Sequence, residues 1–408
     1  MEGADEMLNL EAFISEKVIK REKSMFLGDI HSYEPVLTQK IAGKTALVIG
    51  GAGSIGSSFI RAILPFRPAS LVVVDTNENA LAELTRDLRS TKGMYVPEEY
   101  ITYPMDFASD VFRKMFVKHG GFDIVANFSA HKHVRSEKDI YSVEALLQNN
   151  VLHAKLLLDL LAEYPPEEYF CVSTDKAANP VNIMGASKRI MEDVIFSYSD
   201  RFPVKTARFA NVAFSNGSLP AGFLARIQKL QPLSAPSDVR RFFVSPEESG
   251  QICMLACMLG NNREIFFPKL SDAQMMTFDA IGTELLHQYG YEVLHCSSDE
   301  EAIEKAEDLK HGSRMYPVHY AVSDTSGEKP FEEFYTDTES IDMDRFSALG
   351  VITGKDIPDQ EKIRTLFVEL NRAFGREETT KEEVVRIMAQ YLPNFEHIET
   401  GKSLDNKM

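Results

Sequence analysis

Cysteine, long apolar runs and positive charge are all scarce in this chain of 408 residues. Its four cysteines are too few and too scattered to form a disulfide scaffold. No apolar run approaches the roughly 18 residues that a membrane-spanning helix needs. The N-terminus, MEGADEMLNL, is acidic and lacks the layout of a signal peptide. These absences predict a soluble, cytoplasmic protein without a membrane span.

The shortage of positive charge also limits the expected partners. The chain has 44 lysines and arginines against 61 aspartates and glutamates, which gives a formal net charge of −17. Such a surface repels nucleic acids and anionic membranes, so no nucleic-acid partner is expected. An anionic ligand must instead be held locally, by a few placed cations or by the N-terminus of a helix.

A regular alternation fills the region between Lys44 and about Asn211. Short β-branched runs predict six buried strands, and longer stretches with helical spacing predict five helices between them. The predicted strands are TALVIG, SLVVVD, YITYPMD, DIVANFS, EYFCVST and VKTARFA. This order predicts an α/β fold of the Rossmann type, a doubly wound parallel sheet with helices on both faces.

The pattern changes on either side of this region, which suggests three parts. We expect an N-terminal arm over residues 1–40 and a dinucleotide-binding Rossmann domain over residues 41–212. Residues 213–408 are expected to form a smaller mixed region that binds substrate, with segments that return to the Rossmann domain. The chain shows no internal repeats.

A glycine-rich turn follows the first predicted strand, in VIGGAGSIGSS. Gly50, Gly53 and Gly56 fit the spacing G-x-x-G-x-x-G, in which the absent side chains let the backbone turn tightly and approach a pyrophosphate. Ser54 and Ile55 then open a helix whose free N–H groups and dipole attract phosphate. The turn therefore predicts a dinucleotide site.

Acidic residues at the ends of the next two strands refine this prediction. Asp75 ends the second strand, 19 residues after Gly56. A carboxylate there accepts hydrogen bonds from the hydroxyls of the adenosine ribose and repels a 2′-phosphate, which favours NAD over NADP. Asp106 ends the third strand and is placed either to contact adenine or to cap the following helix.

The fifth predicted strand ends in STDK, at the carboxyl edge where open α/β sheets bind ligands. Thr174 there precedes Asp175 and Lys176, which can act as an acid and a base on adjacent atoms of a substrate. The next helix contains MGASK, in which Lys188 lies one turn after Met184.

These motifs resemble those of the extended short-chain dehydrogenase/reductase superfamily. The stretch STDKAANPVNIMGASK resembles its polysaccharide-biosynthesis branch, the UDP-N-acetylglucosamine 4,6-dehydratases, and in particular the configuration-retaining type of the bacillosamine and legionaminic acid pathways. The resemblance spans about residues 42–337. Its further matches are NFSAHKHV, NNV, RFANV, RRFF, EIFFPK and GEKPFEEFYTD.

The resemblance implies a dehydration in which bound NAD is regenerated. Oxidation at C-4 of the sugar makes the C-5 proton acidic, a base removes it while the 6-hydroxyl leaves with a proton, and the hydride returns to C-6. Lys176 is then the C-5 base and Asp175 the C-6 acid, while Thr174 contacts the 4-hydroxyl and Lys188 holds the nicotinamide ribose. A lysine base requires a lowered pKa, from burial or a nearby cation.

Met184 departs from the parent superfamily, which has a tyrosine there to take the proton of the 4-hydroxyl. A thioether cannot accept that proton at neutral pH. The group that accepts it stays open, with Asp175 acting through Thr174 as the first hypothesis. Asn150 matches a superfamily asparagine that kinks the long fourth helix.

A UDP-sugar substrate needs local cations to hold its diphosphate. Arginine suits this task because it donates two parallel hydrogen bonds. The candidates, from family position, are Lys132, His133, Arg208, Asn211, Arg240 and Arg241. The two histidines of HKH lack a third ligand nearby, so no metal is expected. The superfamily default is a homodimer through the fourth and fifth helices, or a higher homo-oligomer.

Several functions remain open on this sequence. The leading one is a retaining 4,6-dehydratase that serves surface glycans. A C-5-inverting dehydratase is its nearest rival, because some such enzymes share the methionine. A nucleotide-sugar 4-epimerase needs the missing tyrosine and has no use for the Asp-Lys pair. A non-catalytic NAD sensor would have a decayed site.

Overall fold

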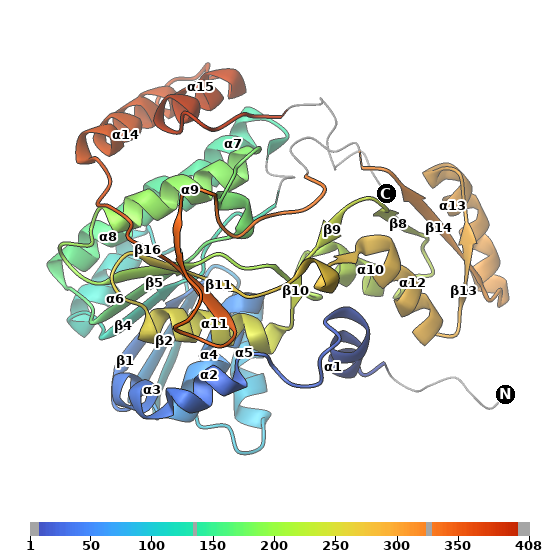
Figure 1. Cartoon of the computed structure of the whole chain (residues 1–408), viewed down its shortest axis with the longest axis horizontal. Helices are drawn as coiled ribbons and strands as arrows, with labels where there is room; N and C mark the ends of the chain where they lie inside the picture. Colours follow the sequence, from blue (N-terminus) through green and yellow to red (C-terminus); the bar gives the residue numbers. More distant parts are fainter. Residues whose placement is uncertain (1–7, 134–136, 324–328, 399–408) are drawn as a thin grey trace.

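The structure of the chain is a computed structural model that describes residues 8–133, 137–323 and 329–398. A large body holds a nine-stranded sheet, and a smaller lobe beside it holds a three-stranded one (Figure 1). Within the large sheet, the neighbouring strands β11-β6-β5-β4-β1-β2-β3 are all parallel. The predicted α/β class with a doubly wound parallel sheet is confirmed.

All six predicted strands form and lie side by side. They are β1 (Thr45–Ile49), β2 (Ser70–Asp75), β3 (Glu99–Pro104), β4 (Ile124–Asn127), β5 (Glu168–Val172) and β6 (Val204–Ala207). Three strands from the C-terminal half of the chain extend the sheet beyond β6: β11 (Glu264–Pro268) runs parallel to β6, and β16 (Leu349–Thr353) and β15 (Ser340–Asp342) follow in antiparallel order.

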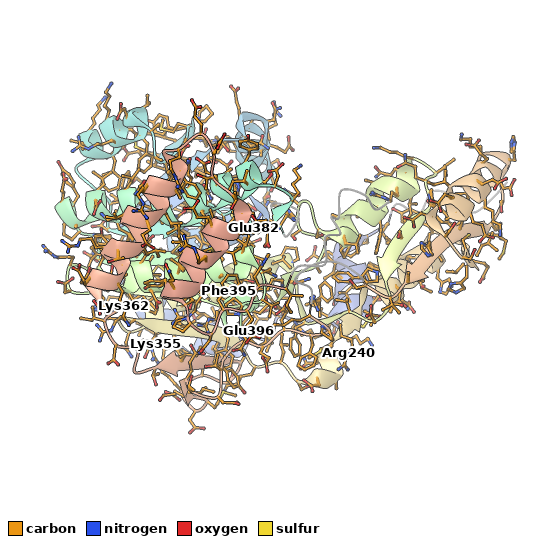
Figure 2. All side chains as sticks on the ribbon, turned by 90° about the horizontal axis from the view of Figure 1, so that it is seen from above. Arg240, Lys355, Lys362, Glu382, Phe395 and Glu396 are labelled. Atoms are coloured by element: carbon orange, nitrogen blue, oxygen red, sulfur yellow. The ribbon has the colours of Figure 1, made fainter. Side chains whose placement is uncertain are left out.

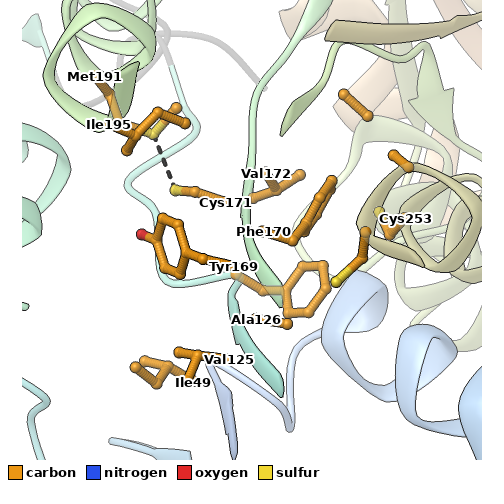
Figure 3. Packing of buried hydrophobic residues seen from close by; sticks show 14 of the residues in the cluster. Ile49, Val125, Ala126, Tyr169, Phe170, Cys171, Val172, Met191, Ile195 and Cys253 are labelled. Carbon is orange, nitrogen blue, oxygen red and sulfur yellow. Dashed lines mark hydrogen bonds between the residues drawn. The ribbon is translucent and has the colours of Figure 1, made fainter. Parts of the chain in front are cut away.

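Helices cover both faces of this sheet. The predicted ones are α4 (Ser54–Ile63), α5 (Glu78–Ser90), α6 (Asp110–His119), the pair α7 (Ile140–Leu147) and α8 (His153–Glu163), and α9 (Ile183–Phe196). Alternate residues of β5 face opposite layers, because Phe170 points toward Cys253 of α11 (Pro246–Leu259) whereas Cys171 points toward Met191 of α9 (Figure 3). Burial on both faces explains why the strands read as continuous apolar runs.

The long fourth helix contains an irregular turn. A π-helical segment, Gln148–Leu152, separates α7 from α8 and contains the buried Asn150. Its amide donates to the carbonyl of His131 at 3.0 Å and to Ser187 Oγ at 3.1 Å, while its Oδ1 accepts from the His131 N–H at 2.9 Å. The irregularity that was predicted at this asparagine is therefore present, and it connects the loop after β4 to α9.

The smaller lobe has its own apolar core. Its sheet consists of β13 (Glu292–His295), β14 (Met315–Ala321) and β8 (Leu233–Pro236), all parallel, and it packs with α10 (Leu219–Gln228), α12 (Phe278–Gln288) and α13 (Asp299–Lys305). Two short strand pairs lie between the lobes: β7 (Asn211–Val212) with β10 (Phe243–Val244), and β9 (Arg240–Arg241) with β12 (Met276–Thr277).

The N-terminal arm, as far as it is described, packs on its own chain. Its first turns, α1 (Leu10–Phe13) and the π-helical Ile14–Val18, bury Phe13 and Val18 in the core of the smaller lobe. The helices α2 (Leu27–Ser32) and α3 (Glu34–Ile41) lie on the large body. Between them, Arg21 Nε donates to Glu248 of α11 at 2.7 Å. The arm thus links the two lobes, which the sequence alone did not indicate.

Two helices near the end of the described chain, α14 (Gln360–Phe374) and α15 (Lys381–Tyr391), lie over α9 (Figure 1). The Tyr391 hydroxyl donates to Asp193 Oδ2 at 3.3 Å, and Gln360 Nε2 donates to the carbonyl of Ser197 at 2.7 Å. As a result α9, one of the two helices expected to pair in a homodimer, has no exposed residue. In the described part of the chain, no helix has both the length and the hydropathy to cross a bilayer.

Candidate active site

The glycine turn after β1 has the backbone geometry of a dinucleotide loop. Gly50 has a φ of +70°, and a Cβ there would lie 2.7 Å from the backbone nitrogen of Ser129. A Cβ on Gly56 would lie 2.3 Å from the carbonyl oxygen of Gly50. Gly53 precedes α4 and offers no capping side chain, so the N–H groups of Ser54 and the first turn can meet an anion. These residues fit the pyrophosphate of a dinucleotide.

The two predicted adenosine contacts differ in their surroundings. Asp75 ends β2, and its carboxylate accepts from the N–H of Ala52 in the glycine turn at 3.1 Å and from that of Asn77 at 2.9 Å. A carboxylate accepts more than two hydrogen bonds, so Asp75 keeps capacity for ribose hydroxyls. Asp106 is exposed and does not cap α6, because Ser109 does. The adenine contact of Asp106 stays a prediction.

The predicted acid–base motif lies at the carboxyl end of β5, as expected from the strand pattern. Thr174 begins a 3₁₀ turn, Asp175–Ala177. Asp175 is 3% exposed, and its Oδ1 accepts three hydrogen bonds: from Thr174 Oγ1 at 2.8 Å, from the Lys176 N–H at 2.9 Å and from Lys176 Nζ at 3.2 Å. The three motif residues therefore form one connected group.

Lys188 and Met184 lie on α9, which follows this turn. Lys188 is buried, and burial lowers the pKa of its ammonium although Cys171 and Glu192 oppose the shift. Its Nζ donates to the weakly accepting thioether of Met191 at 3.3 Å, so it retains donors for a ligand. Met184 is buried, and its backbone N–H donates to Glu137 Oε1 at 2.8 Å.

The contacts of Arg208 contradict its predicted role in binding the substrate diphosphate. Its side chain is fully buried, and all five of its N–H donors are occupied: Nε and Nη2 by Glu192, Nη1 and Nη2 by Glu339, and Nη1 also by the carbonyl of Phe334. An arginine with no donor left cannot hold a diphosphate. The predicted substrate contact of Arg208 is therefore wrong in this geometry, and the residue joins α9 to the segment before β15.

Arg241 also makes contacts within the chain. It is buried in β9, and its Nη1 donates to the carbonyls of Lys329 at 2.9 Å and Pro330 at 3.3 Å. Its Nη2 lies 3.9 Å from Glu332 Oε1. The neighbouring Arg240 is exposed and lies where the two lobes meet (Figure 2).

The remaining predicted substrate residues flank the same junction. Lys132 and His133 are exposed after β4, and Asn211 opens β7 half-buried. The His133 ring lies against Gly217, since a Cβ on that glycine would come within 3.0 Å of His133 Nε2. Their contacts with a substrate stay predictions. Within the described residues, no group of three His, Cys, Asp or Glu side chains could hold a metal ion.

One group beside the acid–base motif was not anticipated. Glu332 is 5% exposed, and its Oε1 lies 3.8 Å from Lys176 Nζ. Burial raises the pKa of the Glu332 carboxyl and Asp175 acts in the same direction, whereas Lys176, Arg241 and Lys329 oppose the shift. The only signal in the sequence was the stretch GEKPFEEFYTD, which carries two adjacent glutamates and marked the family without assigning either of them.

The fold and these residues define a class, an α/β protein in which a glycine-rich turn after β1 and a Thr-Asp-Lys group after β5 lie at the same carboxyl edge of a parallel sheet. A family model described as "Polysaccharide biosynthesis protein" matches residues 46–346. The chain belongs to this family.

Individual relatives match at low identity over most of this chain. "Uncharacterized membrane protein MJ1061" of Methanocaldococcus jannaschii is 27% identical, covering 83% of this chain and 94% of its own. "Probable polysaccharide biosynthesis protein EpsC" of Bacillus subtilis is 26% identical over 82% of this chain, which spans only 54% of that relative's length.

Two further relatives have names that state an activity. "UDP-N-acetylglucosamine 4,6-dehydratase (inverting)" of Campylobacter jejuni is 24% identical, covering 74% of this chain and 84% of its own. "UDP-glucose 4-epimerase" of Rickettsia conorii is 29% identical, and the match covers 70% of this chain and 88% of that relative.

Solved structures share the fold. Pen from Bacillus thuringiensis superimposes with a TM-score of 0.63 at 18% identity, covering 81% of this chain and 98% of its own. A second structure is the dTDP-glucose 4,6-dehydratase DesIV from Streptomyces venezuelae, solved with NAD and TYD bound. It has a TM-score of 0.51 at 19% identity, and the match covers 68% of this chain and 88% of DesIV.

Proposed function

We propose that the protein is an NAD-dependent hydro-lyase that converts UDP-N-acetylglucosamine to UDP-2-acetamido-2,6-dideoxy-4-keto-hexose, with retention at C-5, for surface glycan biosynthesis. The observation that carries the proposal is the group of Thr174, Asp175 and Lys176, joined by hydrogen bonds at the ligand edge of β5. The family, its named dehydratase relative and the NAD-bound dehydratase neighbour support the same class of reaction.

The cofactor would be held by residues of the large body. The glycine turn and the first turn of α4 would bind the pyrophosphate, and Asp75 would accept from the adenosine ribose. Lys188 would donate to the nicotinamide ribose, because its ammonium is buried and, among the described residues, a thioether is its only hydrogen-bond acceptor. When bound, NAD would supply the acceptor for the C-4 hydride and the donor that returns it to C-6.

The missing tyrosine is replaced by a relay in this proposal. The hydroxyl of Thr174 donates to Asp175 Oδ1 at 2.8 Å, and its oxygen accepts from the Lys176 N–H at 3.5 Å. A hydroxyl oxygen has two lone pairs, so one can still accept from a 4-hydroxyl. As the 4-hydroxyl is oxidised, its proton passes to Thr174 while the threonine proton passes to Asp175. Lys176 then removes the C-5 proton. Met184 takes no part in proton transfer.

Two other activities have specific support. The relative named as an inverting dehydratase supports a reaction in which C-5 is protonated from the opposite face. The roles of Thr174, Asp175 and Lys176 would be the same in that reaction. The epimerase relative favours a 4-epimerase, although Met184 cannot serve as that enzyme's base. A non-catalytic NAD-binding sensor would show no turnover at all.

One experiment separates these activities. The purified protein is incubated with UDP-N-acetylglucosamine in heavy water, without added cofactor, and the product is followed by mass spectrometry and NMR. We expect loss of water and deuterium at C-5, with a coupling pattern that shows retained configuration. Inverted coupling would establish the inverting enzyme, a 4-epimer with its 6-hydroxyl intact would establish the epimerase, and unchanged sugar would contradict catalysis.

The glycine turn gives a second test. Replacing Gly56 with alanine is expected to lower the melting temperature and to abolish copurification of NAD, because the new Cβ would lie 2.3 Å from a backbone oxygen. Gly53→Ala is the matched control for the melting temperature, since among the described residues its Cβ would meet only the Gly50 oxygen, at 3.4 Å, and its φ of −72° suits any residue. Equal melting temperatures of the two variants would contradict this account.

A further inference from the structure

Glu137 is a buried carboxylate between β4 and α7, and the mechanism proposed above does not use it. Its Oε1 accepts from the backbone N–H of Met184 at 2.8 Å. That N–H belongs to the first turn of α9, where backbone donors have no acceptor within the helix. Asn182 accepts from the next donor, the N–H of Gly185, at 2.7 Å. Glu137 therefore completes the N-terminal cap of α9 with an anion, which the helix dipole favours at this end.

The first turn of α9 lies directly against the backbone of the acid–base motif. A Cβ on Gly185 would come within 2.6 Å of the carbonyl oxygen of Lys176, so a side chain there would push the two segments apart. Lys188 lies further along the same helix. A displacement of this first turn would therefore move Lys176 and Lys188 relative to each other.

Two side chains of the C-terminal segment contact Glu137 from the other side. Lys381 Nζ, at the start of α15, donates to the backbone carbonyl of Glu137 at 2.8 Å. His397 Nε2 lies 3.6 Å from Glu137 Oε2, and the His397 side chain is mostly buried. Glu137 thus meets α9 with one carboxylate oxygen, and it meets the C-terminal segment with the other oxygen and with its backbone.

The same segment also reaches the residues just before α9. The Ile398 N–H donates to the carbonyl of Val181 at 3.0 Å, and Phe395 is buried in the core of the large body. The helix α15 and the residues after it lie outside residues 46–346, the part of the chain that matches the family model. A segment beyond the matched region is thus built against the start of α9.

We propose that Glu137 is a positioning residue of the dehydration, and that Lys381 and His397 hold it in place for this task. The inference rests on the proposed function. Through a backbone N–H, the Glu137 carboxylate fixes the first turn of α9 against the backbone of Lys176. Lys176 and Lys188 then keep the spacing that the reaction requires. Glu137 itself exchanges no proton with the substrate.

Substitutions at residue 137 separate the reach of the side chain from its charge. Glu137→Gln keeps an oxygen at the same reach and loses the charge, whereas Glu137→Asp keeps the charge and is shorter by one methylene group. Because positioning depends on reach, kcat for UDP-N-acetylglucosamine should fall by less than about fivefold in Glu137→Gln and by about 100-fold in Glu137→Asp and Glu137→Ala. KM should change little in all three variants, because the interaction acts on the reaction rather than on substrate binding. Glu163→Ala, at the exposed end of α8, is the control and should leave kcat unchanged.

A double-mutant cycle tests the contribution of the C-terminal segment. Lys381→Met combined with His397→Ala should lower kcat by about tenfold in the wild-type background and by less than about twofold in Glu137→Ala, because both residues act through the side chain that this variant lacks. Lys362→Met, at an exposed position of α14, is the matched control and should change kcat in neither background. Equal losses in the two backgrounds would overturn the part that Lys381 and His397 play.

Hydrogen exchange gives a readout that needs no substrate. Peptides that cover residues 181–188 should exchange faster in Glu137→Asp and Glu137→Ala than in the wild type, because the cap of α9 loses a hydrogen bond. Glu137→Gln should stay close to the wild type. Peptides from β2 are the internal reference, since a general loss of stability would raise their exchange as well.

The outcomes separate this inference from the proposed function. Wild-type protein that leaves UDP-N-acetylglucosamine unchanged would overturn both. Wild-type turnover with no loss of kcat in Glu137→Ala, or with equal losses in Glu137→Gln and Glu137→Ala, would overturn the positioning role alone. If the alanine variant does not fold, the other two variants decide, and a higher kcat in Glu137→Asp than in Glu137→Gln would overturn the inference.

Discussion

Replacing Lys176 with arginine is expected to reduce turnover of UDP-N-acetylglucosamine by about 10³-fold. Arginine keeps the positive charge between Asp175 and Glu332, so the fold and the ion pairs should survive. It cannot be deprotonated in a protein, however, and therefore cannot remove the C-5 proton. In the proposed mechanism, oxidation at C-4 does not need this base, so reduced nicotinamide should accumulate on the protein and be visible by its absorbance.

The measurement needs a comparison with a lysine outside the site. Lys155→Arg on α8, where the lysine pairs with Asp159 near the surface, should leave kcat within twofold of the wild type. Lys176→Arg should also show no deuterium at C-5 in heavy water. Retention of a tenth or more of the wild-type rate would rule out Lys176 as the base.

Removing Arg208 is expected to have the largest effect on stability. Arg208→Ala should lower the free energy of unfolding by about 3–5 kcal/mol, because it leaves Glu192 and Glu339 buried without their shared cation. Urea denaturation followed by circular dichroism measures the change. Arg364→Ala is the control, since its ion pair with Glu361 on α14 is exposed and should contribute less than about 1 kcal/mol. Similar losses in the two variants would contradict a structural role for Arg208.

The same ion pairs make the stability sensitive to acid. Burial alone would raise the pKa of Glu339, but Arg208 and Lys355 outweigh it and lower that pKa to about 2. A carboxyl whose pKa is depressed by folding stabilises the protein above its unfolded value of 4.5, and this contribution disappears as the pH falls toward 2. The difference in stability between wild type and Arg208→Ala should therefore shrink over that range.

The sequence predicted the large sheet well, because its strands are buried on both faces and its helices have clear periodicity. All six runs became strands, and the glycine turn has the expected backbone at Gly50 and Gly56. The strands β11, β15 and β16 were not predicted as part of this sheet. Their pairing depends on contacts between distant segments, which periodicity does not report.

The predicted site was less complete for the same reason. The motif at residues 174–176 is local, and its residues do lie together. Arg208 was assigned to substrate from its family position and because arginine can donate two parallel hydrogen bonds to a diphosphate. Its partners Glu192 and Glu339 come from distant segments. Glu332 was missed because nothing in a single sequence shows that it lies beside Lys176.

The position of α14 and α15 on α9 has a consequence for how the protein holds α9 in place. The helices α14 and α15 belong to the same polypeptide as α9, so their attachment to α9 is intramolecular and does not weaken when the protein is diluted. The helix that carries Lys188 therefore keeps its packing in a solitary molecule. Because α9 has no exposed residue, we expect any copies that associate to do so through other surfaces.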